Sequence, residues 1–206
     1  MLSALIAGLL LGLSAGFSPG PLLALVIAQT LQHGMREGIR VAFAPFLTDV
    51  PIVLLVVLVL TQLANFKPIL GIIALLGSAF VLYLASESFR AQPIAATAST
   101  VAPQSLGKGA LVNLFSPHPY LFWFTVGAPT LFKAWSEAPF AAVAFVAGFY
   151  VCLVGSKIAI ALLVGKSRAW FSGEPYRWIM RGLGALLALF AGVLVFDGLT
   201  LLGWVR

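Results

Sequence analysis

Long apolar segments separated by short polar ones run along the whole chain. The first charged side chain is Arg36, and similar charge-poor stretches recur up to the C-terminus. Apolar runs of about 20 residues fit transmembrane helices, whereas the strands of a membrane barrel would alternate apolar and polar positions. The pattern therefore predicts an all-α polytopic membrane protein. Its six expected spans lie at about 2–31, 38–62, 67–88, 107–132, 138–165 and 179–203.

Two of these spans contain the same short interruption. Ser18-Pro19-Gly20-Pro21 lies in the first span, and Ser116-Pro117-His118-Pro119 lies in the fourth. Proline has no backbone N–H and clashes with the carbonyl four residues earlier, so paired prolines break a helix. In each copy, we expect the serine to be the N-cap and the next proline to be the first residue of a new half-helix.

A helix broken inside a membrane exposes backbone groups of both signs. Each new half-helix points free N–H groups into the break, while the prolines free the carbonyls of residues 15, 17, 113 and 115. Donors suit a carboxylate, and acceptors suit an ammonium group or a cation. Broken helices at matching places in two inverted halves indicate the binding site of a transporter. The candidate binding residues are Ser18, Pro19, Gly20, Pro21, Asn113, Ser116, Pro117 and His118.

The loops predict how the chain is oriented. The stretch 91–106 is rich in Ala, Pro, Ser and Thr and is expected to join two three-helix halves, 1–90 and 107–206, which form an inverted repeat. Loops and helix ends after the first, third and fifth spans carry Arg36, Arg40, Arg90, Lys108, Lys166, Arg168, Arg177 and Arg181, against Lys67, Lys133 and Arg206 opposite. The positive-inside rule then predicts both termini on the outer side of a bacterial inner membrane.

Asp49 and Lys157 are charged residues in the middle of predicted spans. Each lies nine residues from a basic helix end, which places both about 13 Å from the cytoplasmic boundary. A charge at this depth costs about 2.5 kcal/mol or more. We expect an ion pair between them that opens when Asp49 is protonated or substrate arrives, either for proton coupling or as a purely structural contact. Asp197, close to Arg206, is expected in the outer half and without a role in transport.

Composition excludes several other classes of protein. The chain is 61% hydrophobic and 9% charged, whereas soluble domains are about 25% charged. Its net charge of +6 lies in loops, where topology explains it better than nucleic-acid binding. The single cysteine, Cys152, excludes an internal disulfide. Ser116 and His118 are two residues apart and cannot face each other on one helix, so no serine protease is expected. Neither a cofactor nor a resident metal is expected.

Glycines recur at every fourth position of the first span. Gly8, Gly12 and Gly16 form a stripe of small residues of the kind that lets two membrane helices approach closely. The partner is either a neighbouring helix of the same chain or a second protomer, so a homodimer is one of two alternatives.

Together, these residues resemble the LysE/RhtB family of bacterial amino-acid exporters over nearly the whole chain. Pro19-Gly20-Pro21 with the loop HGMREGIR is similar to the first helix and loop of the family. Asp49 matches an acidic residue of its second helix, and KGALVNLFSPHP resembles its fourth. The resemblance implies six helices in an inverted repeat and proton-driven efflux of amino acids or similar small zwitterionic solutes.

One part of the resemblance is incomplete. Ser116-Pro117-His118 stands where the family usually has Asn-Pro-Lys, and Lys157 is interpreted as a replacement for that lysine. His118 is then either a proton carrier or a simple hydrogen-bonding residue. Export of metal ions, other inorganic ions or small organic anions on the same scaffold remains the alternative function.

Overall fold

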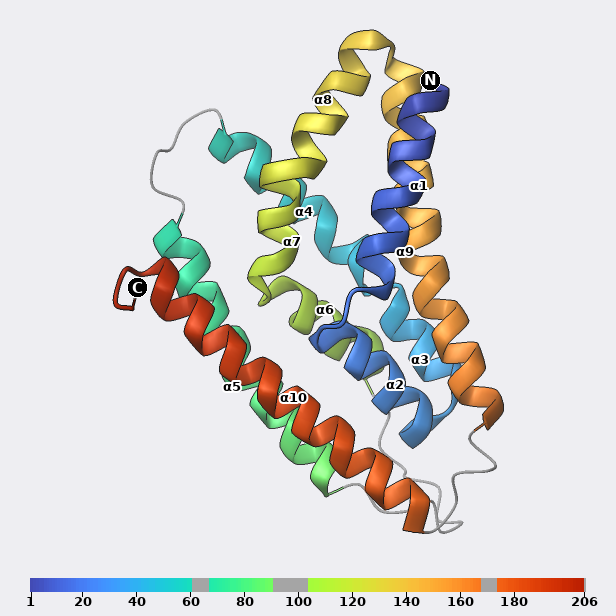
Figure 1. Ribbon diagram of the computed structural model, residues 1–206, viewed down its shortest axis with the longest axis vertical. Coiled ribbons are helices and arrows are strands. Elements are labelled where there is room, and N and C mark those ends of the chain that lie inside the picture. The colour runs from blue at the N-terminus through green and yellow to red at the C-terminus, as the bar shows by residue number, and fades with distance from the viewer. Residues whose placement is uncertain (61–66, 91–103, 168–173, 206) are drawn as a thin grey trace.

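The computed structural model is built from helices and has no strand in the residues it describes, which are 1–60, 67–90, 104–167 and 174–205 (Figure 1). This confirms the all-α prediction. The helices are α1 (Leu2–Phe17), α2 (Pro21–His33), α3 (Met35–Ala42), α4 (Ala44–Leu60), α5 (Lys67–Phe89), α6 (Ser105–Leu114), α7 (Pro117–Phe122), the π-helix η1 (Trp123–Gly127), α8 (Ala128–Glu137), α9 (Pro139–Ser167) and α10 (Glu174–Leu201).

Within the described residues, four helical segments are long and apolar enough to cross a membrane. They are Met35–Val56, Gly71–Phe89, Pro139–Ser167 and Tyr176–Leu201. A fifth span arises if α1 and α2, which meet at an angle of 63°, are counted as one. The chain is therefore a multi-pass membrane protein by length and composition.

The remaining predicted span, 107–132, is interrupted once, between α6 and α7. After that break, α7, η1 and α8 follow one another directly from Pro117 to Glu137, so this part is one helical stretch that contains a π-helix. The predicted joint at 91–106 lies outside the described residues as far as 103, and Ser105 already begins α6.

The glycine stripe of α1 packs against α9. A Cβ added to Gly8 would lie 2.2 Å from the carbonyl oxygen of Phe145, and one on Gly12 would lie 2.1 Å from that of Phe149. A Cβ on Gly16 would likewise clash with α9. The stripe is therefore used inside the protomer, where it brings the two helix backbones into contact along most of α1.

Gly12→Ala is expected to lower the temperature of thermal unfolding, because the added methyl group forces α1 away from the backbone of α9. Overpacking of this kind costs about 1–3 kcal/mol. Gly155→Ala on α9 is the matched control, since a Cβ there meets no atom within 4 Å. Thermal unfolding of both purified variants in detergent is the measurement. Equal unfolding temperatures would contradict this account of the contact between α1 and α9.

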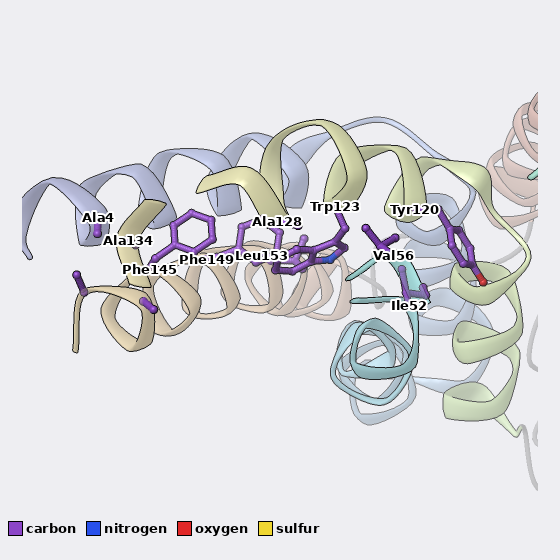
Figure 2. Close-up of a cluster of buried hydrophobic side chains, with 12 residues drawn as sticks. Ala4, Ile52, Val56, Tyr120, Trp123, Ala128, Ala134, Phe145, Phe149 and Leu153 are labelled. Carbon is purple, nitrogen blue, oxygen red and sulfur yellow. The ribbon is translucent and has the colours of Figure 1, made fainter. Parts of the chain in front are cut away.

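An aromatic core joins α9 to the pieces of the fourth span (Figure 2). Phe149 of α9 packs edge-to-face against Trp123 of η1, with ring centroids 5.5 Å apart. It also stacks on Phe122 at the end of α7, at 5.0 Å and an interplanar angle of 12°. Ile52 and Val56 of α4 belong to the same buried cluster. The core fixes the short helices relative to α1, α4 and α9.

A second helix pair, α5 and α10, runs side by side (Figure 1). Its helices approach closely at Gly71 and Gly198, where a Cβ on either glycine would lie about 3 Å from the carbonyl oxygen of the other. Since the two helices lie in different predicted halves of the chain, this contact ties the halves together.

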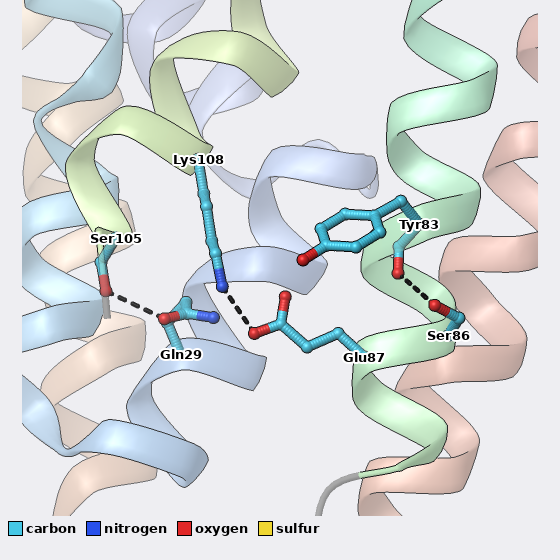
Figure 3. A network of polar contacts seen from close by, with 6 residues as sticks. All are labelled: Gln29, Tyr83, Ser86, Glu87, Ser105 and Lys108. Atoms are coloured by element: carbon cyan, nitrogen blue, oxygen red, sulfur yellow. Dashed lines mark hydrogen bonds and ion pairs between the residues drawn. The ribbon is translucent and has the colours of Figure 1, made fainter. Parts of the chain in front are cut away.

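A polar network connects that pair to the centre of the molecule (Figure 3). The Ser105 hydroxyl donates to the side-chain oxygen of Gln29 at 2.9 Å, which joins α6 to α2. Lys108 forms an ion pair with Glu87, which joins α6 to α5. The network lies near the ends of α2 and α5 and the start of α6, in the lower half of the molecule in Figure 1.

Candidate functional site

A cavity of about 470 Å³ lies where the broken helices meet. This volume is within the range of about 300–1,000 Å³ that is typical of small-molecule sites. All the predicted binding and coupling residues line it except Pro117, which is buried in α7. The lining residues from the prediction are Ser18, Pro19, Gly20, Pro21, Asp49, Asn113, Ser116, His118 and Lys157.

The first junction differs in detail from the sequence prediction. Gly20 is the N-cap, in extended backbone, and Pro21 is the first residue of α2. The expected N-cap at Ser18 and helix start at Pro19 are therefore wrong. A residue before proline is disfavoured in helical conformation, and this applies to Ser18 as well as to Gly20. As a result, helical structure resumes only at Pro21.

The second junction starts its helix where the sequence predicts. Ser116 is the N-cap, with φ −95° and ψ 134°, and Pro117 is the first residue of α7. The Ser116 Oγ lies 3.3 Å from His118 Nδ1, so the expectation that these side chains cannot face each other is wrong. The helix rule does not hold because Ser116 lies outside the helix in extended backbone. The Tyr120 hydroxyl donates to the carbonyl of Leu114 at 2.8 Å, at the end of α6.

Lys157 binds the end of the first half-helix. Its Nζ donates to the carbonyl oxygens of Gly16 at 2.9 Å and Ala15 at 3.4 Å. Pro19 has no N–H for the Ala15 carbonyl, and a cation at a helix C-terminus is favourable. The side chain is almost fully buried, with 3% of its surface exposed. Lys157 therefore satisfies backbone groups that the break would leave unpaired in the membrane.

Asp49 is held by neutral donors. Its Oδ1 accepts a hydrogen bond from Asn113 Nδ2 at 2.9 Å, and its Oδ2 accepts one from the Tyr150 hydroxyl at 3.1 Å. Asn113 Nδ2 also donates to Thr48 Oγ1 at 2.7 Å. These contacts connect α4, α6 and α9 at the wall of the cavity.

The predicted ion pair between Asp49 and Lys157 is not formed. Salt bridges form elsewhere, between Arg40 and Glu37 and between Lys108 and Glu87, whereas within the described residues neither Asp49 nor Lys157 takes part in one. The physical reason is that each charge has found other partners: Lys157 binds carbonyls at a helix end, and Asp49 accepts from an amide and a hydroxyl. The two groups nevertheless line the same cavity, with opposite charges.

Sequence reasoning missed the aromatic residues of the site. Tyr150 lies seven residues before Lys157, a spacing that places both on one helix face, and this signal was available. Trp123 lines the cavity with only 2% of its surface exposed, and its Nε1 has no hydrogen-bond partner in the described part of the chain. It begins the π-helix η1, a form that is frequent at functional sites. Nothing in the sequence predicts that π-helix.

Other polar residues give no support to a metal site or a further charged site in the cavity. The described residues contain no group of three or more His, Cys, Asp and Glu side chains that could hold a metal ion. Asp197 is half-buried in α10 and is not among the lining residues of the cavity.

Fold and site define a multi-pass membrane protein whose helices enclose a cavity with polar groups of both signs. A family model described as LysE type translocator matches residues 13–198. The chain therefore belongs to the LysE-type translocator family, which confirms the resemblance seen in its motifs. Searches of curated proteins and of solved structures gave no match. The family consists of membrane exporters rather than enzymes.

Proposed function

We propose that this protein exports amino acids or similar small zwitterionic solutes in exchange for protons. The observation that carries the proposal is that one cavity holds both helix junctions together with Lys157 and Asp49. Lys157 and the first amides of α2 are donors for a carboxylate. The hydroxyls of Ser18 and Ser116 and the side-chain oxygen of Asn113 are acceptors for an ammonium group.

Asp49 is the proposed site of the coupling proton. A carboxyl group inside a membrane marks proton relays in many transporters. Its partner Tyr150 supports this role, because a hydroxyl both donates and accepts. It can donate to the carboxylate, as in the structure, and accept from the protonated acid. Asp49 can therefore bind and release a proton while it keeps a hydrogen-bond partner.

The proposed arrangement in the membrane is six spans in an inverted repeat, with the first and fourth broken at the Ser-Pro-x-Pro motifs. Both termini lie outside the bacterial inner membrane. In support, the α2–α3 turn, the ends of α5 and α9 and the start of α10 lie at one end of the molecule, and the N-terminus and the α8–α9 turn at the other (Figure 1). The first end carries the basic residues Arg36, Arg40, Arg90 and Lys166.

Counterflow in proteoliposomes tests the substrate class. Vesicles holding the purified protein are loaded with unlabelled amino acids, small organic acids or divalent metal ions in turn, and uptake of the labelled compound is followed. Accumulation of an amino acid above protein-free vesicles is the expected result. Accumulation of only a metal ion or an organic anion would instead favour the alternative exporters on this scaffold.

Gly20→Leu is expected to abolish substrate binding without loss of folded protein. Gly20 lines the cavity in extended backbone that any residue adopts, and a Cβ there meets no protein atom within 4 Å. The leucine side chain therefore occupies space that is left for the solute. Substrate-dependent thermal stabilisation is the measurement, and unfolding without ligand is the control. Wild-type affinity in this variant would contradict a site at the first junction.

A further inference from the structure

We propose that the cavity selects zwitterionic solutes with a large apolar or aromatic side chain and rejects basic amino acids, an inference that rests on the proposed function. Three properties of the lining support it: the balance of its charges, the free donors close to the first junction and the aromatic wall formed by Phe122, Trp123 and Phe149.

The charges in the lining balance each other. Asp49 and Lys157 are its acidic and basic residues, and His118 is the remaining titratable group. A zwitterion brings no net charge and keeps this balance. The side chain of lysine or arginine adds a positive charge, for which the lining has no second carboxylate. The charge of Asp49, the one carboxylate of the lining in the part of the chain that the structure describes, is already offset by that of Lys157. An extra buried charge without a partner is strongly unfavourable.

The donors of the lining suit the carboxylate of the solute. An ammonium group has three N–H donors, and Lys157 directs one to Gly16 at 2.9 Å and one to Ala15 at 3.4 Å. The first turn of α2, where backbone N–H groups have no partner within the helix, contributes Leu22 and Leu23 to the lining.

The aromatic wall suits an apolar side chain. Phe122 and Phe149 stack at 5.0 Å, and Trp123 meets Phe149 edge-to-face, so the three rings form one packed surface. Phe190 and Val193 of α10 also line the cavity. Trp123 and Phe149 are already buried, so Phe122 is the partly exposed ring of the wall. A large apolar side chain in this space removes its own surface and that of Phe122 from water. Alanine or glycine buries less apolar surface, and we expect them to bind about tenfold more weakly or worse.

Competition in counterflow tests the inference on the full-length protein. Uptake of labelled phenylalanine is measured in competition with unlabelled phenylalanine, leucine, alanine or lysine. We expect phenylalanine and leucine to give half-inhibition at concentrations at least about tenfold lower than alanine and lysine do. Phe122→Ala shortens the wall and should reduce the preference for phenylalanine over alanine several-fold. Phe140→Ala, at an exposed position at the start of α9 (78% exposed), is the matched control and should keep the wild-type preference.

The outcomes separate this inference from the proposed function. Labelled alanine and labelled lysine are measured in parallel, so that transport of any amino acid is detected. Equal or better transport of alanine or lysine would overturn the selectivity while leaving amino-acid export standing. An unchanged preference in Phe122→Ala would also overturn it. Transport of no amino acid at all would overturn the proposed function and the inference together.

Discussion

Asp49→Asn is expected to abolish efflux driven by a proton gradient while substrate exchange continues. Asparagine keeps the size of the side chain, and its oxygen can accept from Asn113 as Asp49 Oδ1 does. Its amide N–H groups can donate to the Tyr150 hydroxyl, which accepts as well as donates. The local structure is therefore preserved. A side chain that cannot bind or release a proton imitates only the protonated state, so it allows exchange but not coupling.

Two assays in the same proteoliposomes separate these effects. Efflux under an imposed pH gradient should fall to the level of protein-free vesicles, whereas counterflow at equal pH should stay near the wild-type rate. Asp197→Asn is the matched control, because that residue lies outside the cavity lining and should keep driven efflux. Undiminished driven efflux in Asp49→Asn would exclude Asp49 as the coupling site.

Lys157→Met is expected to destabilise the protein strongly and to abolish binding. Methionine keeps most of the length of the side chain but has no donor, so the carbonyls of Ala15 and Gly16 lose the partner that the structure gives them. A buried polar group left unsatisfied costs about 1–3 kcal/mol. The same change removes the positive charge that faces the carboxylate of the proposed substrate.

A double-mutant cycle with Asp49→Asn tests the partners of both charges. Asp49 and Lys157 have separate hydrogen-bond partners but lie in one cavity with opposite charges. The two changes in unfolding free energy should therefore add except for a small coupling of about 0.5 kcal/mol. A double variant that is more stable than Lys157→Met alone would instead reveal a direct ion pair. Thermal and denaturant unfolding of the four proteins in detergent are the measurements. The cycle therefore decides between the sequence prediction and the contacts seen in the structure.

The sequence singled out most of the polar residues that line the cavity because its signals are local and chemical. Proline pairs and charges in apolar segments are rare, and counting residues from the basic helix ends placed Asp49 and Lys157 at one depth. Both residues line the same cavity, in agreement with that common depth. The depth of a residue does not, however, tell toward which neighbouring helix its side chain points. Asp49 therefore faces Asn113 and Tyr150, where the sequence had assigned it Lys157.

The fold was predicted less completely than the site. The long helices α5, α9 and α10 could be predicted because a run of about 20 apolar residues is enough to indicate a transmembrane helix. The break before α7 was predicted from Pro117, whereas the π-helix η1 was not, because it depends on tertiary packing around Trp123 and Phe149 that no local pattern encodes. The glycine stripe indicated a close contact, but only the structure distinguishes α9 from a second protomer.

The close contact between α1 and α9 has a mechanical consequence. With Gly8 and Gly12 against the backbone of α9, the two helices cannot slide or separate without losing contact along most of α1. Lys157 and the carbonyls of Ala15 and Gly16 therefore travel as one rigid body. Opening of the cavity to either side of the membrane must then come from displacement of other parts, such as α5 with α10, relative to that body. A disulfide crosslink between α1 and α9 should accordingly leave turnover intact.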